Sequence, residues 1–368
     1  MEEQKISIPK LIGAYLVVYI VWGSTFFFIE EALRSFPPFV LGSIRFMLAG
    51  PILMGYCAIR GYKIFNKEDI KQAMFIGFLL LFVDMAAIIW SEQFISSAIV
   101  SIISAATAIW FIVLDKPKWK ENFTSLPILL GLLFGFLGVV MLFAEQLFTN
   151  SVSEKERSEN IIAMLVLTFG TIGWTIGSLY SKYSQKPKSV EKKKTPSLNV
   201  MVKTAWQMLT AGVAFTMVAL IKGEYSNFDY SAVHAADWGA MIYLIMMGSI
   251  LAFSSYIWLL QVRPATEVST YAYVNPIVAL VLVYFFTDHQ VTLLQIAGLG
   301  VVLVSVLLMN WNLYKDNRTF RALRYRKKLK KLRNMAPKSS IPRIVEVADF
   351  QRKQKEKAIK KEQEKSIS

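Results

Sequence analysis

Two charged side chains, Arg45 and Asp84, fall inside long apolar stretches of the sequence. Burial of a charge in hydrocarbon costs at least about 2.5–3.5 kcal/mol on insertion scales, so such a side chain normally faces a cavity or a partner. The two lie at similar depths, about 12 Å and about 9 Å from the ends of their stretches at about 1.5 Å per residue. Two interpretations follow. The residues form a static ion pair between helices, or a pair that a solute or a proton opens, with Arg45 holding a carboxylate or phosphate.

Further polar and aromatic side chains in the apolar stretches are candidates to line a cavity with these charges. They are Trp22, Ser24, Trp174, Gln207, Tyr271 and Asn275. For Gln207, a hydrogen bond between helices is the alternative interpretation. Pro276 lacks a backbone donor and crowds the carbonyl of Ala272, so we expect a bend there, which is either a hinge or a fixed kink.

The sequence offers little for chemistry that needs a nucleophile, a metal or a cofactor. Cys57 is the single cysteine, and the two histidines, His234 and His289, fall in predicted loops without the spacing of metal ligands. No nucleotide-binding motif occurs either. We therefore predict no catalytic residues, no metal site and no cofactor.

The elements that position the candidate residues are apolar helices. The chain of 368 residues is 54% apolar, and a run of about 20 apolar residues crosses a bilayer core of about 30 Å. Such runs lie near residues 11–31, 37–59, 70–90, 94–114, 126–144, 161–181, 200–221, 237–260, 266–287 and 292–313. We predict an all-α integral membrane protein with ten transmembrane helices.

The distribution of charge predicts orientation. Lys and Arg gather in alternate connections, 60–71, 115–120 and 182–203, so the positive-inside rule places both termini in the cytoplasm. The tail from Lys315 to Ser368 carries 19 Lys or Arg against 6 Asp or Glu, a net +13 of the chain's +15. Because this excess follows the last apolar run, it indicates anionic lipids of the cytoplasmic leaflet as a partner rather than nucleic acid.

The two halves of the chain repeat each other. Trp90-x-x-Gln93 lies 168 residues before Trp258-x-x-Gln261, and the segment that begins at Arg45 aligns with the one that begins at Gln207. Repetition on this scale is typical of a duplicated membrane bundle. Five helices per repeat reverse the orientation of the second repeat, so we predict two inverted five-helix repeats.

This prediction divides the chain into segments. They are a cytoplasmic N-terminus at 1–10, a first repeat at 11–144, an exterior loop at 145–160, a second repeat at 161–313 with a cytoplasmic linker at 182–199, and a basic cytoplasmic tail at 314–368. In the repeat register, Thr107-Ala108 stands where the second half has Asn275-Pro276. We therefore expect the first half to be stiffer and to lack the bend.

Several short motifs resemble a known family. The first half has Trp22-Gly-Ser-Thr25, Pro37-Pro38, Arg45-Phe46 and Trp90-Ser-Glu-Gln93, and the second half has Gly177-Ser-Leu-Tyr-Ser181, Gln207-Met208 and Ser269-Thr-Tyr-Ala-Tyr-Val-Asn-Pro276. In combination, over residues 14–312, they resemble drug/metabolite transporters of the EamA type. The resemblance implies a central cavity between inverted repeats and transport of small organic solutes by alternating access. Ala108 and Asp84 depart from the family pattern, the latter standing where a small residue is expected.

The expected function is secondary transport across the cell membrane. Export of small metabolites, amino-acid-like solutes or drugs is the main hypothesis, with protons as a candidate coupling ion. Uptake or exchange of a phosphorylated or carboxylated solute at Arg45 is the alternative. A receptor or scaffold gives no reason for an inverted repeat with polar groups at mid-depth, and an intramembrane enzyme would need a constellation of residues that the sequence does not show.

Overall fold

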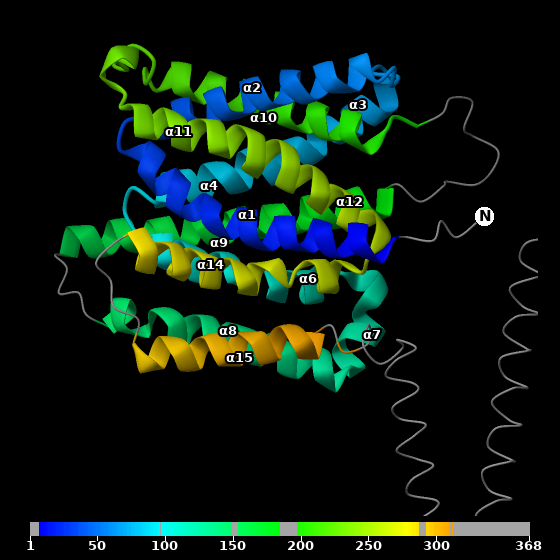
Figure 1. Ribbon diagram of the computed structural model, residues 1–368, viewed down its shortest axis with the longest axis vertical. Helices are drawn as coiled ribbons and strands as arrows, with labels where there is room; N and C mark the ends of the chain where they lie inside the picture. Colours follow the sequence, from blue (N-terminus) through cyan, green and yellow to red (C-terminus); the bar gives the residue numbers. More distant parts are fainter. Residues whose placement is uncertain are drawn as a thin grey trace, which may run out of the picture. The chain divides into compact units, whose positions relative to one another are not determined.

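The computed structural model describes residues 7–95, 97–148, 154–184, 197–286, 292–309 and 311. In these residues every regular element is a helix, and the helices of residues 8–309 run roughly along one direction (Figure 1). In chain order they are α1 (Ile8–Leu33), α2 (Pro38–Ile59), α3 (Lys67–Gly77), η1 (Phe78–Val83), α4 (Asp84–Ser91), α5 (Ser97–Ala105), α6 (Thr107–Leu114), η2 (Lys116–Lys118), α7 (Trp119–Thr124), α8 (Leu126–Phe148), α9 (Glu154–Ser184), α10 (Val200–Ile221), η3 (Tyr230–Ala232), α11 (Ala235–Tyr243), η4 (Leu244–Phe253), α12 (Ser254–Val262), α13 (Ala265–Val268), α14 (Tyr271–Phe286) and α15 (Leu293–Met309).

Seven helical stretches of the described residues are long and apolar enough to cross a membrane. An eighth is possible if the pair Lys116–Thr124 and Leu126–Met141, bent by 90°, is one span. Two apolar helices, Ile103–Leu114 and Ile296–Met309, are shorter. The all-α membrane class expected from composition is confirmed, whereas the count of ten crossings stays a prediction.

The ends of the helices follow from local sequence. Asn66 caps α3 and Asn199 caps α10, each with its side-chain oxygen accepting from backbone N–H groups of the first turn. Beyond the C-termini of α2 and α10 lie Gly61 and Gly223, with φ of 70° and 69°, a region that glycine enters without steric cost. Since α2 and α10 are both 22 residues long, the two repeats match in this helix from cap to cap.

Two segments adopt the wider π-helical turn, η1 before α4 and η4 between α11 and α12. With the 168-residue spacing of the repeat, η1 corresponds to residues 246–251, which lie within η4. The π-helix is rare and is often found at functional sites. Its occurrence at matching places in both halves shows that the repeat extends to unusual backbone structure.

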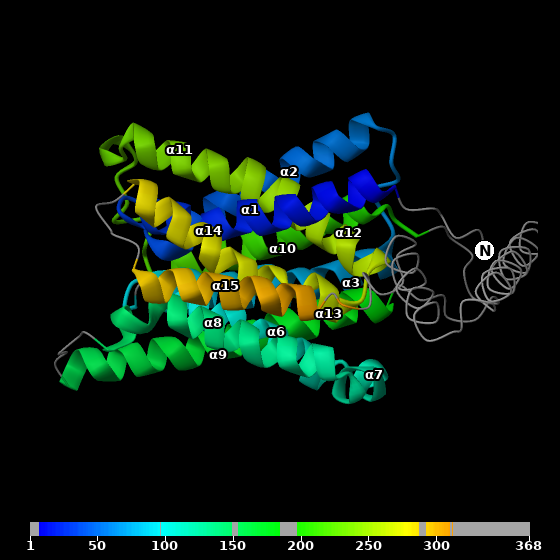
Figure 2. The same ribbon diagram turned by 60° about the horizontal axis from the view of Figure 1, so that its bottom comes forward.

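Helices of one half pack against their counterparts in the other. The most extensive contacts join α2 with α10 and α8 with α15, and Figures 1 and 2 show both pairs side by side. Small residues allow these close approaches: a Cβ on Gly42 would lie 2.4 Å from the ring of Phe215, and one on Gly138 would lie 2.9 Å from the backbone nitrogen of Val302. The pairing of counterparts is what a two-fold relation between the halves requires.

The helix with the proline is not interrupted at the proline. Helix α14 continues through Pro276, and the interruption comes earlier, at Ser269 and Thr270 between α13 and α14. The first half has its own interruption at Ala106, between α5 and α6, although Ala108 replaces the proline there. The expectation that the first half lacks a break is therefore wrong, and the break in each half arises without help from the proline ring.

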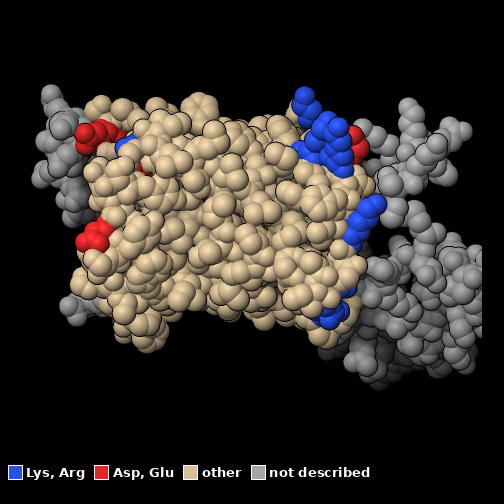
Figure 3. Space-filling model, turned by 90° about the horizontal axis from the view of Figure 1, so that it is seen from above, with Lys and Arg blue, Asp and Glu red and all other residues tan. Residues whose placement is uncertain are grey.

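Charged residues gather at the two ends of the bundle (Figure 3). We call the end with the α2–α3 and α6–α7 connections the basic end, since Lys63, Lys67, Lys118 and others lie there, and the end with the α1–α2 and α10–α11 connections the acidic end. Between them the visible surface is almost free of charge, as expected for a lipid-facing belt.

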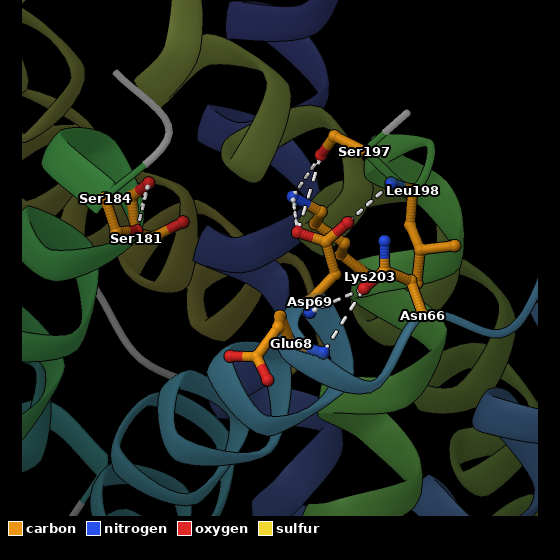
Figure 4. Close-up of polar contacts among 8 residues, drawn as sticks. All are labelled: Asn66, Glu68, Asp69, Ser181, Ser184, Ser197, Leu198 and Lys203. Atoms are coloured by element: carbon orange, nitrogen blue, oxygen red, sulfur yellow. Dashed lines mark hydrogen bonds and ion pairs between the residues drawn. The ribbon is translucent and has the colours of Figure 1, made fainter. Parts of the chain in front are cut away.

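One polar network ties the two halves together at the basic end (Figure 4). The carboxylate of Asp69, near the start of α3, accepts from the backbone N–H of Leu198 at 2.7 Å and pairs with the Lys203 ammonium at 3.1 Å. Ser197 Oγ in turn accepts from Lys203 Nζ at 2.9 Å. These contacts hold α3 of the first half against the start of α10 in the second.

Candidate functional site

A cavity of about 70 Å³, large enough for several water molecules, lies between the two halves. It begins at mid-depth and extends toward the acidic end, since the lining residues of α1 run from Trp22 to Ile29 and those of η1 and α4 from Leu81 to Ile88. Helices α2, α5, α6, α9 and α14 and segment η4 complete the wall. Both halves therefore contribute to one enclosed site.

Most of the residues singled out from the sequence meet at this cavity. Its lining includes Trp22, Arg45, Asp84, Trp174, Tyr271 and Asn275. Ser24 does not line it, because its hydroxyl bonds Tyr243 Oη at 2.6 Å between α1 and α11. Gln207 is also absent from the lining and packs with its backbone against Gly77 of α3. Both residues thus have packing positions rather than cavity positions.

Arg45 presents an unused donor inside the bundle. It is 3% exposed, and its Nε donates to Ser249 Oγ at 2.8 Å. Its Nη1 is enclosed and has no hydrogen-bond partner. A Cβ on Gly248 would lie 3.2 Å from Nη2, so a glycine leaves room for the guanidinium. The planar fork of donors is suited to a carboxylate or a phosphate, and a buried donor without a partner is unfavourable until an acceptor arrives.

Asp84 faces the same cavity but does not pair with Arg45. It begins α4 directly after η1 and is 5% exposed. No ion pair within 4.0 Å joins it to Arg45 in this structure, so the static pair expected from their depths is not formed. The cavity instead presents a cationic group and a carboxyl at separate places in its wall.

Aromatic rings form one side of the site. Trp22 lies at their centre, with ring centroids 5.3 Å from Trp174, 4.9 Å from Tyr256 and 5.1 Å from Tyr271. Its indole N–H donates to the carbonyl of Gly248 at 3.2 Å, which fixes the ring. Tilted and edge-to-face pairs of this kind are favourable arrangements of aromatic rings. They give the cavity a rigid apolar wall beside its two charges.

Hydroxyl groups are the lining residues that sequence reasoning missed. Thr25, Ser101, Ser104, Thr107, Thr171 and Ser249 all line the cavity. Serine and threonine in apolar helices commonly bond their own backbone, as Thr25 does with the Trp22 carbonyl at 2.7 Å. Their residue type therefore gives no signal of a site, and the contact between Ser249 and Arg45 could only be seen once η4 was placed.

The basic end below the cavity is closed by polar contacts. Tyr19 Oη and Thr270 Oγ1 lie 2.6 Å apart, joining α1 to the break before α14. The Arg263 guanidinium pairs with Glu267 at 2.6 Å. Lys182 at the end of α9 donates to the Leu260 carbonyl at 2.8 Å and to the Arg263 carbonyl. We call these contacts the basic-end closure.

A model of the EamA-like transporter family matches residues 10–144 and 161–311 of the chain. The protein belongs to the EamA-like transporter family. Members of this family are transporters and not enzymes, in agreement with the prediction of no catalytic residues. The match falls once on each half, as the repeat leads one to expect.

Relatives in other organisms are also named as transporters. An inner membrane transporter, YedA, of Escherichia coli K12 is 28% identical over 314 residues, which cover 83% of this chain and 92% of the relative. A "Probable amino-acid metabolite efflux pump" of the same strain is 22% identical over 298 residues, covering 80% of this chain and 92% of the relative. A solved crystal structure aligns with a TM-score of 0.64 at 14% identity, covering 82% of this chain and 96% of the other, which shows that the fold is shared.

Proposed function

We propose that the protein is a secondary transporter that exports small metabolites, amino-acid-like solutes or drugs by alternating access. The observation that carries the proposal is the enclosed cavity between the halves, with the unused Nη1 of Arg45, the Asp84 carboxyl and a rigid aromatic wall. A relative named as an amino-acid metabolite efflux pump supports the same class of solute.

The proposal includes a membrane topology. Ten helices form two inverted five-helix repeats in the cell membrane with both termini cytoplasmic, and the basic end faces the cytoplasm. Support comes from the separation of charge between the ends (Figure 3) and from the positive-inside rule. The basic tail at 314–368, which lies outside the described residues, is proposed to bind anionic lipids.

The chemistry of the cavity suggests how a solute binds. An acidic group of the solute accepts from Arg45, an amino group lies near Asp84, and an apolar body rests on Trp22 and Trp174. Because the cavity extends toward the acidic end while the basic end is closed, this structure corresponds to the state that is accessible from outside. Pro276 remains a candidate hinge, together with the break at Ser269 and Thr270.

Uptake or exchange of a carboxylated or phosphorylated solute is the second candidate. The partnerless Nη1 of Arg45 favours it, because an arginine fork binds an anion without needing an amine. In this case Asp84 would not contact the solute, and its removal would leave solute affinity unchanged.

Transport by purified protein in liposomes tests both candidates. Phenylalanine, 3-phenylpropionate and phenethylamine share one ring and differ only in their charged groups. Preference for phenylalanine supports a site that uses both charges, and preference for 3-phenylpropionate supports the second candidate. Arg45→Gln should abolish saturable transport, with Arg45→Lys as the charge-preserving control. Absence of transport for a broad panel of solutes, with folded protein, would contradict the proposal.

A further inference from the structure

A second carboxyl of α4 is enclosed at the acidic end, above the cavity. Glu92 follows directly after the last residue of α4, and neither of its carboxyl oxygens is accessible or has a hydrogen-bond partner in the described residues. An ionised carboxylate without partners in such a place is strongly unfavourable, whereas a neutral acid tolerates it. The geometry therefore requires a proton on Glu92 in this conformation.

The surroundings of Glu92 favour the same state. It is the C-cap of α4, and the C-terminal end of a helix disfavours negative charge. Glu30 on α1 faces it, and burial together with that charge raises the pKa of Glu92 well above its ordinary value. Among the elements packed on α4, α2 has Arg45 as its one charged residue, η1 has none, and the described charge of α9 nearest this level is Glu159, one turn from Ala163, whose carbonyl accepts from Ser91 Oγ. No cation contacts Glu92 in the described residues.

Glu92 shares a helix face with the cavity. Asp84, Ile88 and Glu92 follow each other at intervals of four residues, and the first two line the cavity. Positions four apart lie on one face of an α-helix, so the two carboxyls are about 12 Å apart along the axis at about 1.5 Å per residue. The hydroxyls of the lining and water in the cavity can occupy the interval, since the site has room for several water molecules.

We propose that Glu92 is the site at which the coupling proton binds from the acidic end, and that Asp84 is the acceptor of that proton within the cavity. The inference rests on the proposed transport function. Protonation forms one O–H bond at a Glu92 carboxyl oxygen, with the proton taken from solution at the acidic end. When the bundle opens at the basic end, the enclosure of these groups changes and the proton is released there, while the solute leaves in the opposite direction.

The site can be tested without a solute, because its ligand is the proton. Infrared difference spectra of the purified protein, recorded between acidic and neutral pH, should show the C=O stretch of a carboxyl that stays protonated above the ordinary range of glutamate. Glu92→Gln should remove that band, and Glu30→Gln should keep it but shift its titration to lower pH. Glu31→Gln is the matched control, since Glu31 lies at the same end but pairs with Arg34 at 2.7 Å. Persistence of the band in Glu92→Gln would overturn the assignment.

A transport assay tests the coupling. With phenylalanine as the probe, exchange at equal pH on both sides needs no net proton movement, and accumulation against a pH gradient does. Glu92→Gln, which has the shape of the protonated side chain, should retain exchange and lose gradient-driven accumulation. Full accumulation in Glu92→Gln would refute the coupling role. If the wild-type protein moves no solute while the band titrates as expected, the transport function fails and the proton site stands. If Glu92→Gln does not fold, the shift caused by Glu30→Gln decides the question alone.

Discussion

Glu267 and Glu92 are carboxyls near opposite ends of the same cavity, and their surroundings differ in one respect. Glu267 has the Arg263 guanidinium at 2.6 Å, and the closure around it joins α1, α9, α12 and α13. Glu92 has no cation and no donor in the described residues. A paired carboxyl holds helices together at every pH at which it is ionised, whereas an unpaired one changes its state with pH. The basic end is thus built to stay closed in this conformation, and the acidic end to respond to protons.

Removal of Arg263 should make the two ends alike and have the largest effect. Arg263→Ala leaves Glu267 partly buried without its cation, so we expect a loss of about 2–3 kcal/mol in stability, somewhat below the cost for a fully buried pair. The basic end should also open. An Ala272→Cys reporter in a Cys57→Ala background lines the cavity, and a membrane-impermeant thiol reagent applied from the basic end should label it faster in Arg263→Ala. Equal labelling rates would show that the pair does not close this end.

The ties at the acidic end provide a contrasting test. Glu224 accepts from the backbone N–H groups of Phe39 and Val40, at 2.8 Å and 3.1 Å, and so caps α2 away from the cavity. Glu224→Ala should cost about 1–2 kcal/mol, as the loss of a helix N-cap does. Because this tie does not border the cavity, labelling of the Ala272→Cys reporter should not change. Thermal denaturation and labelling together distinguish a stabilising contact from a gating one.

A smaller effect is expected beside the closure, at Tyr183. Its hydroxyl donates to Asp115 Oδ1 at 2.5 Å. Burial raises the pKa of Asp115, and the Tyr183 hydrogen bond opposes this rise. Since the folded pKa lies above the unfolded one, stability is highest at low pH and falls as pH rises through the folded pKa. Tyr183→Phe should cost about 1 kcal/mol at neutral pH and less in acid, where Asp115 is neutral, as denaturation at several pH values will show.

The smallest effect should come from the coupling between Arg45 and Asp84, which lie between the two ends. Residues without contact couple by less than about 0.5 kcal/mol, so the double-mutant cycle of Arg45→Gln and Asp84→Asn should give nearly additive stabilities in the absence of solute. Solute affinity should not be additive if one molecule bridges both groups. A coupling in stability of more than about 1 kcal/mol would instead indicate an ion pair in another conformation.

Charge and size decide which site residues the sequence could predict. Arg45 and Asp84 could be found because a charge within an apolar run is unfavourable unless it faces a cavity or a partner, and Trp22 and Trp174 because large rings at mid-depth must pack on something. The separation between Arg45 and Asp84 could not be predicted, since depth along a helix says nothing of rotation about its axis. The break at Ala106 was also hidden, because neither glycine nor proline marks it. Glu92 was missed because its position at a helix end is typical of a solvated side chain.

The π-helical segments have a consequence for how the chain tolerates changes in length. A turn closed by i→i+5 bonds contains about one residue more than an α-helical turn, so η1 and η4 take up extra residues while the flanking helices keep their faces. A one-residue deletion within Phe78–Val83 can be absorbed by conversion to an α-helical turn, which leaves Asp84 directed at the cavity. The same deletion in α9, which has no such segment, rotates everything beyond it by about 100°. Natural variation in length within membrane spans should therefore concentrate at these two segments.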